Sequence, residues 1–345
     1  MRRLELNDAT YRKVVASTEN ILRRLLVTKR YDSISNFLDL YEEYKRSGCG
    51  SLRDLYERYE ATTRPQALGD TCVGLALELM RRWQCLESRF PGLRAATCLM
   101  SCEETVPYVC YDSEVCAGPF DLLAPDKEHV MVGVHITLNG RLGILIADPG
   151  YHVARTITVM VDQQSPHTGW FNHITEPEQI KDYSYSFCEG SLSYVLWKEV
   201  INREGKYKYT TSLIYVGRPY CGGITVTEKR NLVYKLKSLV HRAHNGVSIA
   251  GLYVFLNTPF RDAKINLFYY SKKAKIKKKY NLRKFQDIAS VEENILKKIN
   301  ICNARMELPG GKLLTIINKL AKALSDESFT NQCNEINTYI IQCSI

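Results

Sequence analysis

The pattern of hydrophobic and polar positions is helical in the N-terminal part of the chain. Apolar side chains recur at every third or fourth position over residues 8–30 and again over residues 31–50, which is the period of an amphipathic helix. Pro65 interrupts this pattern, and it resumes after Gly69. We therefore expect a helical bundle over residues 1–97.

The middle of the chain has the alternating pattern of β-strands. Residues 129–151 are HVMVGVHITLNGRLGILIADPGY, two β runs around Asn139-Gly140, and this dipeptide favours a two-residue hairpin turn. Further strand-like runs are RTITVMVD, KYKYTTSLIYV, GLYVFLN and KINLFYYS. We expect an antiparallel, β-barrel-like sheet over residues 98–220.

The last part of the chain mixes the two patterns. Residues 227–246 are predicted to form a helix capped by Thr227, and the tail from Val291 is predicted to be helical with a break at Pro309–Gly311. The predicted fold class is therefore α+β, with the helical bundle carrying the candidate cysteine described below. The β sheet follows, and a mixed α/β region occupies residues 221–345.

Composition and cysteine usage narrow the class of protein. A chain of 345 residues with 45% hydrophobic and 24% charged residues is typical of an ordinary globular protein. The start MRRLELNDATYRK lacks the apolar stretch of a secretory signal, and no window approaches the length of a membrane span. The 12 cysteines are scattered without a Cys-x-x-Cys pair. This favours reduced thiols and a cytoplasmic protein with no transmembrane segment.

The positive charge is concentrated in one place. The net charge is +10, and residues 271–284, SKKAKIKKKYNLRK, hold eight Lys and Arg and no acid. This run is a candidate for binding phosphate or an acidic partner, such as RNA, an acidic membrane or the tail of coenzyme A. The alternative is an exposed loop of solvated lysines. The candidate residues are Lys272, Lys273, Lys275, Lys277, Lys278 and Lys279.

Cys72 has the placement of a nucleophile. In GDTCVGLALELMRRW, Asp70 or Thr71 can cap a helix whose first turn contains Cys72. Backbone N–H groups and the helix dipole favour a thiolate at that position. The alternative is a plain buried cysteine near a helix cap.

The predicted hairpin brings histidine and aspartate together. His129, His135 and Asp148 all lie on one face of it, and the turn places Asp148 opposite Met131, one diagonal step from His129. Diagonal neighbours are about 7–8 Å apart, which long side chains can bridge. His135 is roughly 13 Å from that point along the strand. We therefore predict that His129 pairs with Asp148, with His135 as the alternative base.

Cysteine, histidine and aspartate together support nucleophilic catalysis. The histidine accepts the thiol proton, and the aspartate fixes the tautomer and orientation of the imidazole. The thiolate then attacks an acyl carbon to form an acyl-enzyme, which water or an amine can resolve. The predicted catalytic residues are Cys72, His129 and Asp148.

These motifs resemble the arylamine N-acetyltransferases, within the wider transglutaminase-like, papain-related cysteine enzymes. The resemblance covers roughly residues 64–151: Gly-x-x-Cys at Gly69–Cys72, a strand histidine, and DPGY at Asp148–Tyr151 matching an Asp-x-Gly-aromatic turn. Two features depart from the acetyltransferases. LGDTC replaces their Arg-Gly-Gly run and is closer to the transglutaminase-like pattern, and the cysteine-to-histidine spacing is longer.

The resemblance implies an acyltransferase that works through a thioester. It implies a small-molecule amine or acyl-thioester substrate and no tightly bound cofactor, with acetyl-coenzyme A or another acyl-coenzyme A as co-substrate. One alternative is a transglutaminase-like or peptidase-like enzyme that hydrolyses or cross-links amides on the same triad. Another is a catalytically silent fold that acts as a binding module, with the lysine run contacting an acidic partner.

Other clusters are candidates for metal binding or nucleophilic attack. His241 and His244 have the i, i+3 spacing of two ligands on a helix, without a third ligand nearby. Four cysteines have spacings that fit no common zinc pattern: Cys98, Cys102, Cys110 and Cys116. We therefore predict no metal site. Cys221, in GRPYCGGI, is the alternative nucleophile.

Overall fold

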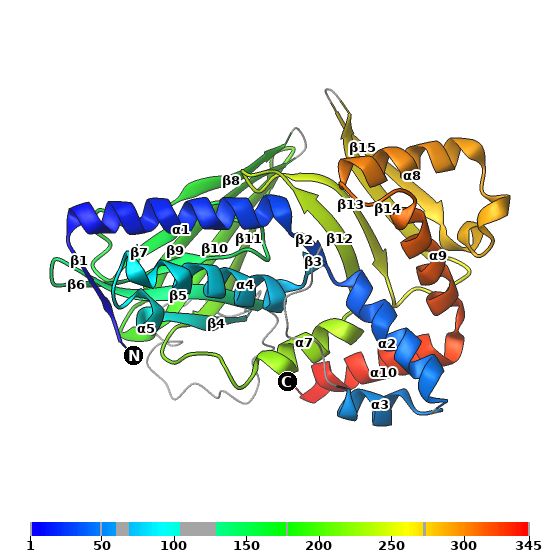
Figure 1. The fold of residues 1–345 in the computed structure, drawn as a ribbon, viewed down its shortest axis with the longest axis horizontal. Helices are drawn as coiled ribbons and strands as arrows, with labels where there is room; N and C mark the ends of the chain where they lie inside the picture. Colours follow the sequence, from blue (N-terminus) through cyan, green and yellow to red (C-terminus); the bar gives the residue numbers. More distant parts are fainter. Residues whose placement is uncertain are drawn as a thin grey trace.

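The protein contains two sheets, each packed against its own helices (Figure 1). The computed structural model describes residues 2–48, 50–59, 69–103, 129–176, 179–271 and 274–343. Within these residues the helices are α1 (Asp8–Thr28), α2 (Ile34–Ser47), α3 (Leu52–Arg58), α4 (Cys72–Gln84), α5 (Leu93–Ala96), α7 (Ile224–Val233), α8 (Glu293–Arg305), α9 (Lys312–Ser325) and α10 (Glu327–Cys343). Short 3-10 turns are η1 (Cys85–Ser88), η2 (Leu282–Phe285) and η3 (Ile288–Ser290).

The first sheet is curled and contains nine of the described strands, in the order β7-β6-β5-β4-β11-β10-β9-β8, with β1 pairing in parallel to β5. Its strands are β1 (Leu4–Leu6), β4 (Thr97–Glu103), β5 (His129–Leu138), β6 (Arg141–Ala147), β7 (Ile157–Met160), β8 (Phe171–Glu176), β9 (Gln179–Cys188), β10 (Ser191–Arg203) and β11 (Lys206–Tyr215). Because β7 also contacts β9, the sheet folds back on itself.

Both faces of the first sheet are buried at β5. Val132 and the alternate residues along β5 pack against α1 and α4, where Trp83 is fully buried. Met131 faces the concave side and packs with Tyr183 and Trp197 from β9 and β10. This explains why β5 is almost continuously apolar, since each alternate set of side chains has its own core.

The second sheet contains six described strands, in the order β15-β14-β13-β12-β2-β3. They are β2 (Arg30–Asp32), β3 (Gly69–Asp70), β12 (Leu236–Arg242), β13 (Ser248–Phe255), β14 (Lys264–Ser271) and β15 (Ala274–Asn281). A separate hydrophobic core joins this sheet to α2, α3, α8, α9 and α10. Figure 1 shows α2 and α3 beside α10, apart from α1 and α4.

The α+β class is confirmed, but the N-terminal helices do not form one bundle. After α1 the chain enters β2, which pairs with β12 of the second sheet, so α2 and α3 pack in the second core. Periodicity identifies a helix's apolar face without identifying the surface that covers it. The domain limits at residues 97 and 220 stay a prediction, since each core draws on segments from both sides of them.

The helix predicted over residues 227–246 is confirmed over residues 227–233 and wrong beyond them. The chain forms the shorter helix α7, with Gly223 rather than Thr227 at its N-cap, and continues as strand β12. Strand β12 buries Lys237, His241 and Arg242 together with its apolar residues. These buried polar side chains mask the alternation that identifies a strand.

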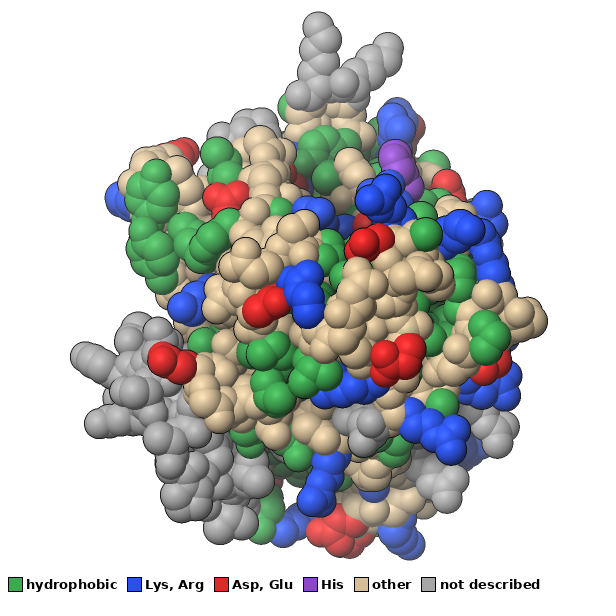
Figure 2. All heavy atoms as spheres, turned by 90° about the vertical axis from the view of Figure 1, so that its left-hand side faces the viewer, with side chains coloured by type: hydrophobic (Ala, Val, Ile, Leu, Met, Phe, Trp, Pro, Cys, Tyr) green, Lys and Arg blue, Asp and Glu red, His purple; other side chains and the backbone are tan. Residues whose placement is uncertain are grey.

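The C-terminal tail forms helices as predicted, and α8 and α9 are separated near the predicted break at Pro309–Gly311. Most of the described part of the basic run is a strand rather than a loop: β15 (Ala274–Asn281) forms the outer edge of the second sheet. Lysines on an edge strand discourage pairing with other chains. Figure 2 shows basic and acidic side chains interspersed on another face of the molecule. No described helix is long and apolar enough to cross a membrane.

Candidate active site

Cys72 is the first residue of α4, as the sequence predicts, and it is 3% exposed. Thr71 precedes it in an extended conformation, and its hydroxyl donates a hydrogen bond to the Glu228 carboxylate on α7. The position at the helix start leaves the Cys72 backbone N–H without an acceptor one turn back. The N-terminus of α4 therefore offers donors and a positive dipole end beside the sulfur.

The predicted hairpin register is confirmed. Leu138 pairs with Arg141 and Val132 with Ala147, so Asp148 follows β6 at the level of the start of β5. His129 Nε2 lies 2.9 Å from Asp148 Oδ1, with both side chains buried. The structure thus brings together the histidine and aspartate that the register favours.

His135 occupies a different environment on the same strand. It pairs with Ile144 across the hairpin, and burial lowers the pKa of its imidazole to about 4. The ring is therefore neutral near pH 7. His129, and not His135, contacts Asp148.

The turn DPGY is held from both sides. The Tyr151 backbone N–H donates to Asp148 Oδ1 at 2.9 Å. The fully buried Arg242 guanidinium donates to the carbonyl oxygens of Pro149 and Lys29. Burial lowers the pKa of Arg242 to about 9, so it remains charged at neutral pH. A strand of the second sheet therefore fixes the turn that carries Asp148.

Gly150 lies where the three candidate catalytic residues meet. A Cβ built on Gly150 would lie 2.6 Å from His129 Cε1, 3.0 Å from Cys72 Cβ and 3.4 Å from Asp148 Oδ1. Only a residue without a side chain allows the turn to approach this closely. The same contacts establish that Cys72 lies beside His129 and Asp148.

If Cys72 and His129 are the catalytic pair that the sequence predicts, replacing Gly150 with alanine is expected to lower kcat/KM about 100-fold, because the new methyl group must push His129 or Cys72 aside and a displacement of about 1 Å has an effect of that size. Gly310→Ala is the matched control, since nothing lies within 4 Å of its Cβ position. Steady-state kinetics on the folded variants checks this. Equal kcat/KM for both variants would contradict the placement of Gly150.

The electrostatics of His129 suit an ion pair. Burial alone lowers the pKa of His129, but the Asp148 carboxylate and hydrogen bonds to Asp148 and Cys72 raise it well above its usual value. Because Asp148 contacts Nε2, Nδ1 is the ring nitrogen that remains for an interaction with Cys72. A protonated His129 can therefore stabilise a Cys72 thiolate through Nδ1 while Asp148 holds the other nitrogen.

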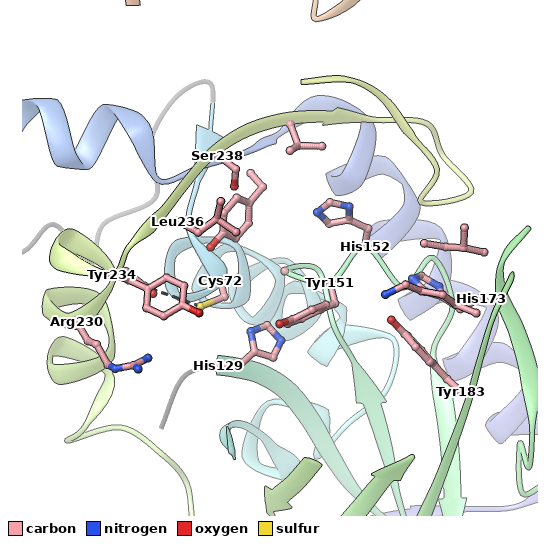
Figure 3. A pocket seen from close by; sticks show the side chains of 16 residues that line it. Cys72, His129, Tyr151, His152, His173, Tyr183, Arg230, Tyr234, Leu236 and Ser238 are labelled. Carbon is pink, nitrogen blue, oxygen red and sulfur yellow. Dashed lines mark hydrogen bonds between the residues drawn. The ribbon is translucent and has the colours of Figure 1, made fainter. Parts of the chain in front are cut away.

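A pocket of about 330 Å³ opens onto Cys72 and His129 (Figure 3). It extends from Arg230 and Tyr234 beside Cys72 to His173 and Tyr183 on the far side. Aromatic rings make up much of its wall: Tyr31, His129, Tyr151, His152, His173, Tyr183 and Tyr234. The pocket therefore favours a substrate with an apolar or aromatic part.

Three residues near Cys72 were not predicted from the sequence. Asn231 and Glu228 lie on α7 and contact Cys72 and Thr71 respectively, and Arg242 fixes the Asp148 turn. All three fall within the segment 227–246, Glu228 and Asn231 in its helical part and Arg242 in the strand that replaces the rest of the predicted helix. The local sequence pattern of this segment does not indicate a site, because the residues that these three side chains contact come from distant parts of the chain.

None of the other metal and nucleophile candidates that the structure describes lines this pocket. His241 is buried on β12, so the helical spacing assumed for His241 and His244 does not exist. Cys98 and Cys102 lie on β4, whereas Cys110 and Cys116 lie outside the described residues. Among the described residues, no group of three or more His, Cys, Asp or Glu could hold a metal ion. Cys221 is exposed and is not among the residues that line the pocket.

The lysine run is only partly described. Lys272 and Lys273 lie outside the described residues. Lys275 Nζ lies 2.8 Å from Glu176 Oε1, so its charge is paired within the protein. The remaining candidates on β15 are exposed: Lys277, Lys278 and Lys279. Binding of phosphate or an acidic partner there stays a prediction.

Comparison with known proteins gives no family assignment. No protein-family profile matches the sequence, and no curated protein matches it.

Among solved structures, a point variant of an arylamine N-acetyltransferase from Mycobacterium smegmatis is 9% identical, with a TM-score of 0.42 over 92% of this chain and 93% of that chain. An arylamine N-acetyltransferase from M. smegmatis is 11% identical (TM-score 0.41; 85% and 92% covered). The enzyme from Nocardia farcinica is 11% identical (TM-score 0.39; 87% and 88%). These values are too low to place the chain in that family.

Proposed function

We propose that the protein is a cysteine-dependent acyltransferase, with Cys72 as nucleophile, His129 as base and Asp148 as the residue that orients His129. The observation that carries this proposal is the approach of all three side chains to Gly150, with Cys72 at a helix start. The hydrogen bond between His129 and Asp148 supports the same assignment. A free thiol at Cys72 fits the reducing, cytoplasmic compartment that the scattered cysteines favour.

The proposed reaction has two acyl-transfer steps. His129 takes the thiol proton of Cys72, and the thiolate attacks the acyl carbon of the donor. The C–S bond forms, the bond to the leaving group breaks, and His129 returns its proton to the leaving group. An amine then attacks the thioester, so that a C–N bond forms and the C–S bond breaks. The amine proton passes to His129 and from there to the Cys72 sulfur.

An amine is the proposed acceptor because DPGY, at Asp148–Tyr151, resembles the corresponding turn of the arylamine N-acetyltransferases. The same resemblance supports acetyl-coenzyme A or another acyl-coenzyme A as donor, and the aromatic pocket wall is compatible with a small apolar amine. The second candidate is an amide hydrolase or cross-linking enzyme on the same residues. It is favoured by LGDTC, which is closer to the transglutaminase-like pattern.

The proposal is tested by intact-protein mass spectrometry after incubation with acetyl-coenzyme A or p-nitrophenyl acetate. We expect one acyl adduct, mapped by peptide analysis to Cys72, and faster loss of this adduct in the presence of an arylamine than in buffer. Loss at the same rate in buffer would favour the hydrolase. An unmodified wild-type protein, or an equal adduct in Cys72→Ala, would reject both enzymes.

A further inference from the structure

Helix α7 reaches the start of α4 from the C-terminal part of the chain. Its residue Asn231 points at the candidate nucleophile, with Asn231 Nδ2 3.7 Å from Cys72 Sγ. Asn231 lines the same pocket as Cys72 and His129. Figure 3 shows Cys72 between His129 on the first sheet and Tyr234 just beyond α7. The Cys72 sulfur therefore lies between the His129 imidazole, which can transfer a proton, and the Asn231 amide on α7, which can donate a hydrogen bond.

The orientation of the Asn231 amide is fixed by its neighbours. The Glu228 carboxylate, 1% exposed, accepts hydrogen bonds from Thr71, from Asn36 Nδ2 at 2.6 Å and from the Asn231 side chain. An amide nitrogen has two hydrogens, so Nδ2 can serve both the carboxylate and the sulfur. The flipped amide would set its oxygen against two acceptors, and this orientation is unfavourable.

The backbone of α7 is also held in place at this point. Lys237 Nζ, fully buried, donates to the carbonyl oxygens of Asn231 and Tyr234, each at 2.6 Å. Both the side chain and the main chain of Asn231 are therefore bound to buried partners. A donor held in this way does not need to reorganise when charge develops beside it, which is the property that oxyanion stabilisation requires.

We propose that the Asn231 side-chain amide and the Cys72 backbone N–H form the oxyanion hole of this site. The inference rests on the proposed acyl transfer at Cys72. When Sγ attacks an acyl group, the C–S bond forms and the carbonyl electron pair moves onto oxygen. That oxygen is two bonds from the sulfur, so an amide 3.7 Å from Sγ is within reach of it. The tetrahedral intermediate then collapses, and the leaving group departs with the proton from His129.

Two reactions of Cys72 separate this role from a general effect on the thiol. Acylation by p-nitrophenyl acetate passes through a tetrahedral oxyanion, whereas alkylation by iodoacetamide displaces iodide without one. Asn231→Ala is expected to slow acylation about 100- to 1000-fold. Its alkylation rate, measured at a pH where the rate has reached its plateau, is expected to stay within about threefold of wild type, since the nucleophile and His129 are unchanged.

Asn231→Leu fills a similar space without a hydrogen-bond donor and should behave like Asn231→Ala. A normal alkylation rate in either variant indicates that the site has folded. Unchanged acylation in both variants would overturn the role of Asn231 and leave the proposed function standing. Equal losses in both reactions would assign Asn231 to the thiolate instead of the oxyanion. A wild-type Cys72 that is alkylated but never acylated would overturn the proposed function and the oxyanion hole together.

Discussion

Replacing Cys72 with serine is expected to abolish the acyl adduct and to lower acyl-transfer kcat/KM by about 10⁴-fold or more. A serine hydroxyl stays protonated near neutral pH, whereas the thiol of Cys72 can give its proton to His129 and attack as a thiolate. Losses of this size accompany removal of the nucleophile in other catalytic triads. Steady-state kinetics and intact-protein mass spectrometry, run on the same preparation, check the prediction.

Cys221→Ser is the matched control, because Cys221 is an exposed cysteine outside the pocket lining. It is expected to keep wild-type activity and the wild-type adduct. The reverse result, with Cys221→Ser inactive and Cys72→Ser active, would assign the nucleophile to Cys221. In that case the close approach of Gly150 to Cys72 would have no role in catalysis.

Replacing Asp148 with asparagine is expected to lower acyl-transfer kcat/KM about 10³- to 10⁴-fold. Asp148 Oδ1 accepts from His129 Nε2 and from the Tyr151 N–H. An amide at this position can present its NH₂ group to the imidazole and so favour the wrong tautomer. The protein is expected to remain folded, because asparagine matches aspartate in shape.

The same variant has a characteristic pH dependence. In the wild-type protein burial opposes protonation of His129, but the Asp148 carboxylate raises the pKa of the imidazole well above its usual value, so the imidazolium is lost as pH rises through that raised value. Without the Asp148 charge, burial opposes protonation of His129 more effectively, and the pKa of the imidazole falls. Alkylation of Cys72 by iodoacetamide near neutral pH should therefore be slower in Asp148→Asn than in wild type, because fewer molecules hold a protonated imidazole beside the sulfur.

The free energy of unfolding is expected to depend on pH through the same pKa shift of His129. Because the pKa of His129 is raised in the folded state, its pairing with Asp148 stabilises the fold fully below about pH 6.5 and is lost as pH rises through the folded value. Denaturant titrations should find the gap between wild type and Asp148→Asn narrowing at alkaline pH. A constant gap would contradict a protonated His129.

His135→Gln is the control for Asp148→Asn. His135 lies on the same strand, is neutral near pH 7 and does not contact Asp148. Its replacement should leave kcat/KM within about threefold of wild type, whatever its effect on thermal stability. A loss as large as that of Asp148→Asn would return His135 to consideration as the base.

The candidate site depends on both sheets. Asp148 and His129 belong to the first sheet, whereas Arg242 on β12 of the second sheet binds the Pro149 carbonyl. Asn231 comes from α7, immediately before β12. A change that shifts one sheet against the other therefore alters the distance between the nucleophile and its donors, and the two cores are coupled through this site.

The sequence by itself determined the features that local geometry controls. The Asn139-Gly140 turn sets the pairing of β5 with β6, and this register is sufficient to select His129 over His135 as the partner of Asp148. The capping pattern before Cys72 likewise predicts a helix start, which the structure has at that residue. Both predictions depend on residues close together in the chain. The helix begins where predicted, although the Thr71 side chain makes no capping hydrogen bond and donates to Glu228 instead.

Only the tertiary structure decided which distant segments meet. The contact between Cys72 and His129, the sharing of the N-terminal helices between two cores, and the arrival of Asn231 all depend on long-range packing. Strand β12 was missed because it buries Lys237 and Arg242, whose polarity hides its inward face from a reading of hydrophobic alternation. These side chains are buried because they bind backbone carbonyls from other segments, and the local sequence does not specify such partners.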